Sequence, residues 1–245
     1  MSGDVDTSMA FYTAVFGWDA EERFDDDGNR IYVEFQRDGK PLAGLGGLPP
    51  GADAMPSTWN SYIAVDDAEA VQARITAAGG SVMLPAMAVM AAGTMGVYTD
   101  PTGAAFSIWQ AGEHHGSAIV NEPNTYAWNE LLTRDVATAK AFYTEVFGWS
   151  YEEADMGPAG TYTLIAGGDN GGLGGIMPMP AELPPMVPNH WMVYFLAADL
   201  PATIDAVKNA GGRLAQEPFD AAGVGTIAVI HDPVGASFSL LQPEN

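Results

Sequence analysis

The chain of 245 residues contains the same fifteen-residue segment twice. Residues 4–18 read DVDTSMAFYTAVFGW and residues 135–149 read DVATAKAFYTEVFGW, so that 11 of 15 positions are identical. The similarity continues at an offset of 132, where Asp100-Pro101 is matched by Asp232-Pro233. A shared helix motif alone would lose register in the loops, so the constant offset predicts a duplicated domain.

We therefore expect two tandem domains, at residues 1–111 and 126–245, joined by a polar linker at residues 112–125. Copy two has a strand-like segment before its first helix. Copy one has only Met1, Ser2 and Gly3 at that place. The first module is thus expected to lack its leading strand and to leave a sheet edge that the linker or a partner covers.

Each copy is in turn built from two similar halves. Asp4 is a good N-cap, apolar residues follow at spacings of three and four, and Gly17 stands where a helix ends. Another helix pattern runs from Val71 to Gly79. Short β-rich segments divided by Gly and Pro follow the helices, at residues 30–36, 97–99, 105–110, 161–166, 226–231 and 237–242. The pattern predicts an α+β fold in which a βαβββ module is used four times.

Composition excludes several functions. There are 9 Lys+Arg against 31 Asp+Glu, and a net charge of -22 repels a nucleic-acid backbone. The absence of cysteine excludes disulfides, thiolate metal sites and a cysteine nucleophile. No signal-peptide pattern and no apolar run of about 18 residues occur, so we expect a cytoplasmic protein that binds neither membrane nor nucleic acid.

Three motifs occur in the same order in both copies: AFYxxxFGW after a capping Asp, a strand leading through Asp into a helix that closes near a Gly-Gly pair, and a DPxGAxFSxxQ-like final strand. In this combination the chain resembles the vicinal oxygen chelate superfamily, which includes glyoxalases, bleomycin-resistance proteins and extradiol dioxygenases. It also resembles the tandem two-domain actinobacterial members of that superfamily. The resemblance implies paired βαβββ modules, each pair forming a curved mixed sheet around a cleft, with helices outside.

Metal-using members of this superfamily take His, Gln or Glu from first strands and Glu from last strands. Carried over by position, these sites fall on residues without carboxylate or imidazole groups, namely Trp128, Met192, Asn60, Ser239 and Ser107. Such side chains are poor ligands for a divalent ion. We therefore expect no metal and no other cofactor.

Two other residues are candidates for acid–base catalysis. Strand periodicity places Glu130 on one face with Trp128, and His190 on one face with Met192 and Tyr194. If both faces line a cleft, Glu130 and His190 could meet across it and act as an acid and a base. The alternative, left open by the sequence, is that both are satisfied structural residues.

Aromatic and methionine side chains dominate the remaining positions. The expected ligand-binding residues are Trp128, Met192, Tyr194 and Ser239 in copy two, with Asn60, Tyr62 and Ser107 in copy one. Walls of this kind hold flat, partly apolar ligands and need few polar anchors.

Three functions follow as hypotheses. The first is a metal-independent protein that binds a small, partly apolar or aromatic molecule, with the complete second domain as the preferred site. The second is a lyase or isomerase of the glyoxalase group that uses Glu130 and His190 or a displaced divalent ion. The third is a non-catalytic structural or interaction protein. A homodimer is compatible with all three.

Overall fold

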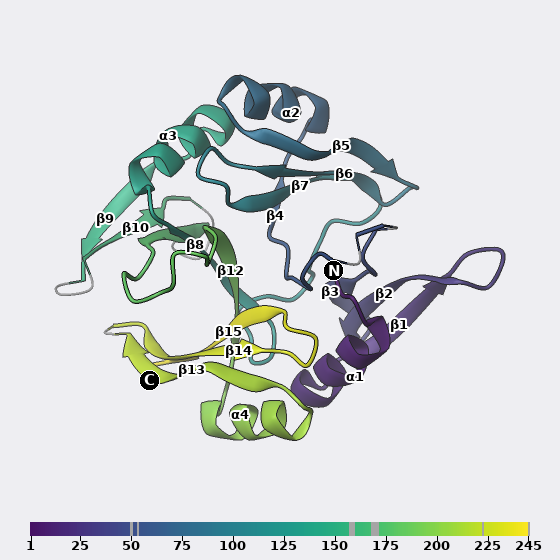
Figure 1. Ribbon diagram of the computed structural model, residues 1–245. Helices are drawn as coiled ribbons and strands as arrows, with labels where there is room; N and C mark the ends of the chain where they lie inside the picture. Colours follow the sequence, from purple (N-terminus) through teal and green to yellow (C-terminus); the bar gives the residue numbers. More distant parts are fainter. Residues whose placement is uncertain (50, 53, 157–159, 168–171, 222, 245) are drawn as a thin grey trace. The chain divides into compact units, whose positions relative to one another are not determined.

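The computed structural model describes residues 1–49, 51–52, 54–156, 160–167, 172–221 and 223–244. The fold is α+β, as predicted, and Figure 1 shows each helix beside the strands that follow it in the chain. The helices are α1 (Val5–Phe16), α2 (Ala68–Ala77), α3 (Val136–Phe147) and α4 (Leu200–Asn209). The strands are β1 (Asp19–Phe24), β2 (Arg30–Arg37), β3 (Lys40–Leu45), β4 (Tyr62–Ala64), β5 (Ser81–Val89), β6 (Gly93–Thr99), β7 (Ala105–Ala111), β8 (Tyr126–Thr133), β9 (Tyr151–Asp155), β10 (Thr161–Ile165), β11 (Gly174–Pro178), β12 (His190–Leu196), β13 (Arg213–Ala221), β14 (Gly225–His231) and β15 (Ser237–Pro243).

The helices begin and end where the repeated motif predicts. The Asp4 carboxylate accepts a hydrogen bond from the Thr7 backbone N–H at 3.0 Å, which satisfies one free donor of the first turn of α1. Gly17 follows the helix with φ 69°, a left-handed conformation that favours glycine. In α3, Asp135 and Gly148 take the same two places, so this local structure is duplicated with its sequence.

The modules share one strand order. In the second module the order is β4-β7-β6-β5, and in the third it is β8-β11-β10-β9. Read from its leading strand, the fourth module has the order β12-β15-β14-β13. The first module contributes β3-β2-β1, without a leading strand. The leading strand runs parallel to the last strand of its module, as in β4 with β7, β8 with β11 and β12 with β15, and the other pairs are antiparallel.

The first module has a single bridge where the third has a leading strand. Ser2 forms an isolated parallel bridge with Gly47, and the equivalent pair in the third module is Thr133 with Pro178. The Ser2 backbone N–H donates to the Gly46 carbonyl at 2.9 Å. In the described chain, therefore, the segment before α1 contributes one bridge to the residues that directly follow β3.

The chain folds into two compact units, and each combines parts of both sequence repeats. Unit 1 contains residues 1–59, 116–127 and 193–245, whereas unit 2 contains residues 60–115 and 128–192. The first module thus packs with the fourth, and the second packs with the third. The predicted boundaries at 1–111 and 126–245 describe the duplication in the sequence, while the compact units cut across them.

Most of the predicted linker belongs to unit 1, where specific bonds hold it. The Trp18 indole N–H donates to the Asn124 carbonyl at 2.8 Å, and Arg37 donates to the Pro123 carbonyl at 2.9 Å. The Ala118 backbone N–H donates to the carbonyl of Pro41 in β3 at 2.8 Å. The segment therefore covers part of the edge that the sequence predicted to be bare.

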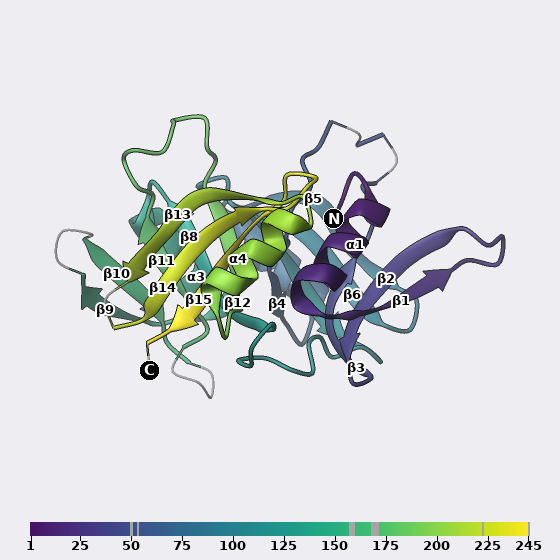
Figure 2. The same ribbon diagram turned by 90° about the horizontal axis from the view of Figure 1, so that it is seen from below.

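Each unit has its own apolar core between its helices and its sheets. In unit 1, Figure 2 shows α4 lying along β13, β14 and β15, and the core joins residues of α1 and α4 to the strands. In unit 2, Phe106 meets Phe142 and Tyr143 edge-on at centroid distances of 5.9 and 5.6 Å. In the described residues, no helix is long and apolar enough to span a membrane.

A polar cluster at the helix side joins the two modules of unit 2. The buried Tyr143 hydroxyl donates to the Asp100 carboxylate at 3.1 Å and accepts from the Trp191 indole N–H at 2.9 Å. Asp100 also accepts the backbone N–H of Thr102 and Ala104, which closes the DPxGA turn. Burial, together with the negative charge of Asp100, raises the pKa of Tyr143 well above its ordinary value, so the hydroxyl remains a donor.

Candidate functional site

The strands of unit 2 have one face against the helices and one face free of them. On β7, Phe106 and Ile108 are buried in the helix-side core. Because side chains alternate along a strand, Ser107 and Trp109 lie on the opposite face. Tyr62 of β4 is the register partner of Ser107 and shares that face.

The leading strand of the third module adds to the same face of unit 2. Leu131 of β8 is buried in the helix-side core, so Trp128 and Glu130 point away from it. The Ser61 hydroxyl lies 2.7 Å from the Asn129 amide oxygen, which joins the chain at β4 to β8. The residues next to Ser61 and Asn129 in the sequence therefore project to the side opposite the core. These residues are Asn60, Tyr62, Trp128 and Glu130.

A hydrogen-bonded cluster forms the polar part of this face. The Trp128 indole N–H donates to the Tyr162 hydroxyl oxygen at 2.9 Å, and that hydroxyl in turn donates to the Glu130 carboxylate. Glu130 is 8 % exposed. Burial, and then the negative charge of Glu130, raise the pKa of Tyr162 far above its ordinary value, so Tyr162 is a fixed donor to the carboxylate.

Gly175 of β11 makes room for the Tyr162 hydroxyl. It is the register partner of Glu130, and a Cβ at this position would lie 1.8 Å from the Tyr162 hydroxyl oxygen. The same pair recurs in unit 1, where a Cβ on Gly44 would lie 1.5 Å from the Tyr32 hydroxyl oxygen. The tyrosine thus lies across a glycine in both units.

Aromatic surface surrounds the polar cluster. Tyr62 is 45 % exposed, and its ring meets the Trp109 ring edge-on at 6.3 Å. The Trp109 indole N–H donates to the His114 carbonyl at 2.8 Å, which fixes the ring. Desolvation raises the pKa of Tyr62, and the neighbouring side chains of Ser107 and Asn60 oppose part of that effect.

The structure therefore groups the predicted ligand-binding residues differently from the sequence repeats. Trp128 of copy two lies in unit 2 with Asn60, Tyr62 and Ser107 of copy one. Tyr194 and Ser239 are register partners in unit 1, and both are buried. Met192, also buried, is the last residue of unit 2 on β12. The reason is that the second module packs with the third rather than with the first.

The predicted acid–base pair has separate described partners. His190 Nδ1 lies 2.8 Å from the Pro188 carbonyl oxygen, so this nitrogen is the donor. Glu130 accepts from Tyr162. Joint catalysis by Glu130 and His190 stays a prediction.

The residues at the superfamily's metal positions do not fit a divalent ion. In unit 2 these positions offer an indole, an amide and a hydroxyl, from Trp128, Asn60 and Ser107. Within the described ranges, no group of three or more His, Asp or Glu side chains is arranged to hold a metal. Hard cations require several charged or carbonyl oxygens, so we derive no step through a metal.

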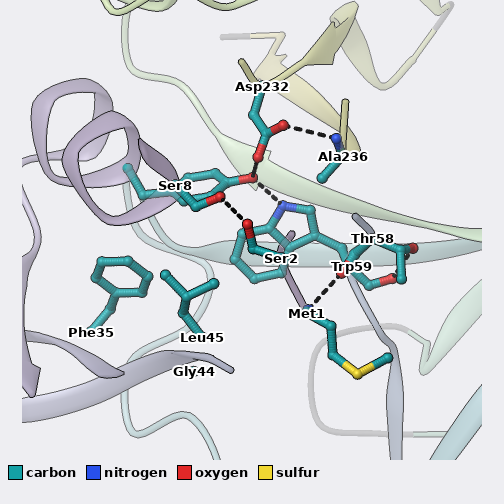
Figure 3. Close-up of a pocket in the computed structure, with 11 residues that line it drawn as sticks. Met1, Ser2, Ser8, Phe35, Gly44, Leu45, Thr58, Trp59, Asp232 and Ala236 are labelled. Carbon is teal, nitrogen blue, oxygen red and sulfur yellow. Dashed lines mark hydrogen bonds between the residues drawn. The ribbon is translucent and has the colours of Figure 1, made fainter. Parts of the chain in front are cut away.

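Two cavities in unit 1 are poor candidates for the main ligand-binding site. One is too small, and the lining of the other includes an arginine that is already paired with two carboxylates. The first has a volume of about 20 Å³, enough for one water, and Figure 3 shows Ser8, Trp59 and Asp232 around it. The second, of about 140 Å³, is lined by Arg30 and Tyr32 among others. Arg30 is already bonded to Asp6 and Glu22.

Sequence reasoning missed Tyr162 and Gly175 as members of the site. The repeat contained the signal. Tyr32 and Gly44 precede Tyr162 and Gly175 by nearly the same number of residues as the first helix motif precedes the second. A tyrosine two residues from the register partner of a glycine on the neighbouring strand indicates a ring that lies diagonally across the backbone.

Comparison with known proteins agrees with the fold. A model of the Glyoxalase/Bleomycin resistance protein/Dioxygenase superfamily matches residues 1–108 and 124–240. The chain is 42% identical over 241 residues to "Putative glyoxylase CFP32" of Mycobacterium tuberculosis (strain CDC 1551 / Oshkosh), covering 98% of this chain and 91% of that protein. It is 34% identical over 262 residues to the anthracycline biosynthesis protein DauV of Streptomyces sp. (strain C5), covering 98% and 90%.

Solved structures share the fold at low sequence identity. The Mn(II)-bound glyoxalase from Novosphingobium aromaticivorans superimposes with a TM-score of 0.64 at 16% identity, covering 100% of this chain and 81% of that one. The 2,3-dioxygenase LapB from Pseudomonas sp. KL28 gives 0.65 at 15%, covering 100% and 90%. With the family match over both halves of the sequence, the chain belongs to the Glyoxalase/Bleomycin resistance protein/Dioxygenase superfamily.

Proposed function

We propose that the helix-free face of unit 2 binds a small, flat, partly apolar molecule and does so without a metal ion. The observation that carries the proposal is a buried carboxylate, Glu130, held by Tyr162 on a face that also presents Trp128, Tyr62 and Trp109. Aromatic side chains stack on flat ligands, and one or two polar groups then fix the orientation.

The relatives support the same chemistry. DauV is named for anthracycline biosynthesis. Anthracyclines as a chemical class contain a planar, polycyclic aromatic portion. A ligand of that general shape matches a face with aromatic walls and few charged groups. Metal independence is supported by the donor chemistry at Trp128, Asn60 and Ser107, which is unsuited to a divalent ion.

The test uses 2-naphthol as the probe and the full-length protein, with ligand-observed NMR as the readout. We expect saturable binding that weakens about three- to tenfold in Trp128→Ala and in Tyr62→Ala, because each substitution removes one aromatic contact. Tyr32→Ala, on the corresponding face of unit 1, is the matched control and leaves the affinity unchanged. Binding that is lost in Tyr32→Ala but kept in the unit 2 variants contradicts the proposed site.

The same titration addresses the metal. After dialysis against a chelator, the dissociation constant for 2-naphthol stays within about twofold, and added Mn²⁺ does not tighten it further, because no metal bridges protein and ligand in this proposal. Loss of binding on chelation and its recovery with Mn²⁺ would overturn metal independence.

A second candidate is catalysis of the lyase or isomerase type, favoured by the buried Glu130 carboxylate and by the glyoxylase name of the mycobacterial relative. A buried carboxylate beside a bound ligand is a suitable general base. If this function holds, Glu130→Gln keeps the ligand bound but abolishes turnover. Equal turnover in the wild type and Glu130→Gln excludes Glu130 as the base.

A further inference from the structure

We infer that the ligand of this face carries at least three linearly fused rings, and that Met95 and Met87 hold the third, apolar ring. This inference rests on the proposed function and adds the class of ligand and two contact residues to it. The strand register places both methionines beyond Trp109, on the side away from Tyr62.

A row of three large side chains crosses the sheet of the second module. Met95 of β6 is the register partner of Trp109 of β7, and Met87 of β5 is the register partner of Met95. Register partners of antiparallel strands have their side chains on the same face. Ala86, next to Met87, packs against the helix-side core, so Met87 points to the opposite, helix-free face. These three side chains, which we term the methionine row, therefore extend the aromatic surface toward the edge of the sheet.

The methionine row is accessible along its length. Met87 is 48 % exposed, and both Met95 and Trp109 are partly exposed. A Cβ on Gly93 of β6 would lie 2.7 Å from Cζ2 of Trp109, so the indole ring fills the space above this glycine. The ring of Trp109 thus reaches from β7 across β6 and presents a broad surface for stacking.

The width of the sheet sets the length of the ligand. Neighbouring strands lie about 4.8 Å apart, so the face is about 14 Å wide from β4 to β5. Two fused rings over Tyr62 and Trp109 leave the outer part of this width uncovered. A third ring in line with them lies over Met95 and Met87, and methionine side chains adapt to aromatic rings and attract them. The methionine row therefore favours a linear molecule over a bent one of equal size.

The sheet that carries the methionine row is uncharged. Its strands β4, β5, β6 and β7, whose residues the structure describes in full, contain no Asp, Glu, Lys, Arg or His. By contrast, β1 and β9 in the other sheets contain three acidic residues each. A charged group over the methionine row would lose water without gaining a partner of opposite charge. The part of the ligand that lies there is therefore apolar.

The fourth module has a different row at the equivalent place. Leu241, Ile227 and Phe219 are register partners in the same way, at an offset of 132 from the methionine row. Ile227, in the middle, is 8 % exposed. This row of unit 1 has aliphatic side chains in place of Trp109 and Met95, and its outer residue, Phe219, supplies a matched control position.

The first experiment compares the shapes of four probes: quinoline, acridine, phenanthridine and 6-quinolinecarboxylate. Each is titrated into the full-length protein by ligand-observed NMR at about pH 8, where the ring nitrogens are unprotonated. Acridine and phenanthridine are isomers with three rings fused in a line and at an angle. We expect acridine to bind about tenfold more tightly than quinoline and at least threefold more tightly than phenanthridine. The carboxylate, which replaces the third ring by an ionised group, should bind no more tightly than quinoline.

The second experiment removes the outer end of the methionine row. Met87→Ala should weaken acridine binding about three- to fivefold and change quinoline binding less than twofold, because only the third ring reaches Met87. Phe219→Ala, the matched control, should leave both affinities unchanged. If Met87→Ala does not fold, ¹³C-methyl methionine spectra of the wild type decide the contact. Acridine should then shift the methyl signals of Met87 and Met95 and leave that of the exposed Met186 in place.

The outcomes separate this inference from the proposed function. If neither 2-naphthol nor any of the four probes binds, the proposed function is wrong and the inference fails with it. If the two-ring probes bind but the two three-ring isomers bind equally tightly, the face binds aromatic molecules and the linear ligand is excluded. Equal weakening of quinoline and acridine in Met87→Ala, tight binding of the carboxylate, or a loss of binding in Phe219→Ala also overturns the inference.

Discussion

The Tyr12 hydroxyl donates to the Asp232 carboxylate at 2.9 Å, across 220 residues of the chain. The same hydroxyl oxygen accepts from the Trp59 indole N–H at 2.8 Å. Asp232 also accepts the Ala236 backbone N–H at 2.8 Å, which closes the turn before β15. The tyrosine of the AFYxxxFGW motif, the aspartate of the DPxG motif and the tryptophan before β4 thus form one cluster in unit 1.

The equivalent cluster in unit 2 joins Tyr143, Asp100 and Trp191. In each unit, the tyrosine and the aspartate come from different sequence repeats. These motifs therefore explain why the first module packs with the fourth and the second with the third. Each repeat carries one half of both clusters.

Removing either tyrosine hydroxyl should destabilise the protein. Tyr12→Phe leaves the Asp232 oxygen and the Trp59 N–H without this partner in a buried place, and an unpaired buried group costs about 1–3 kcal/mol. We expect a loss of about 2 kcal/mol in the free energy of unfolding, measured by urea denaturation. Tyr151→Phe, whose hydroxyl donates to a backbone carbonyl in a partly buried place, is the control and should lose less than half as much. If both variants lose the same free energy of unfolding, the Tyr12 cluster stabilises the protein no more than the single hydrogen bond of Tyr151 does.

The sequence predicted the elements whose pattern is set by a single buried face. The capped helices and the strands β2, β7, β10, β14 and β15 were all expected within a few residues. It did not predict β1, β5, β9 or β13. In β1 every residue is exposed, and β5 and β13 are largely exposed, so no alternation of apolar and polar residues marks them.

For a related reason, the sequence predicted only part of the candidate site. Strand alternation correctly placed Trp128 with Glu130 and Tyr62 with Ser107 on shared faces. Which faces come together depends on the pairing of modules, and a repeat with constant offset is equally compatible with either pairing. The information was in the long-range contacts of Tyr12 and Tyr143, which a single sequence does not display.

Fragments should distinguish the compact units from the sequence repeats. A fragment of residues 60–192 contains all of unit 2, including the Tyr143–Asp100 cluster, so we expect it to unfold cooperatively by circular dichroism. A fragment of residues 1–111 contains one half of each cluster, with unpaired apolar faces on α1 and α2, and should not. Cooperative unfolding of 1–111 together with an unfolded 60–192 would contradict the module pairing.

Stability should fall as the pH drops through the histidine range because of His231. Burial, and then the positive charge of Arg213, lower the pKa of His231 in the folded protein, and its Nδ1 lies 2.8 Å from the Ser237 hydroxyl. The unfolded chain, with a histidine pKa of about 6.5, binds the proton more readily, so the free energy of unfolding decreases below that pH.

His231→Gln should flatten the pH dependence of stability between about pH 7.5 and 5.5, above the range in which most carboxylates titrate. Urea denaturation at several pH values measures the slope. The control is His115→Gln at an exposed position, which keeps the wild-type slope. An unchanged slope in His231→Gln would show that other groups cause the dependence.

Gly175→Ala should disable the candidate site through Tyr162. The added Cβ would come within 1.8 Å of the Tyr162 hydroxyl oxygen and 2.3 Å of the ring carbon that bears it, so the ring must move. Its bonds to Trp128 and Glu130 then break, and the affinity for 2-naphthol should drop about tenfold or more, with a loss of stability of about 1–2 kcal/mol. Adding Tyr162→Ala removes the clash, so part of the stability returns while binding stays weak.

Gly44→Ala creates the same clash with Tyr32 in unit 1 and serves as the control, because it should lower stability without changing the affinity. If Gly175→Ala binds 2-naphthol as tightly as the wild type, Tyr162 does not organise the site.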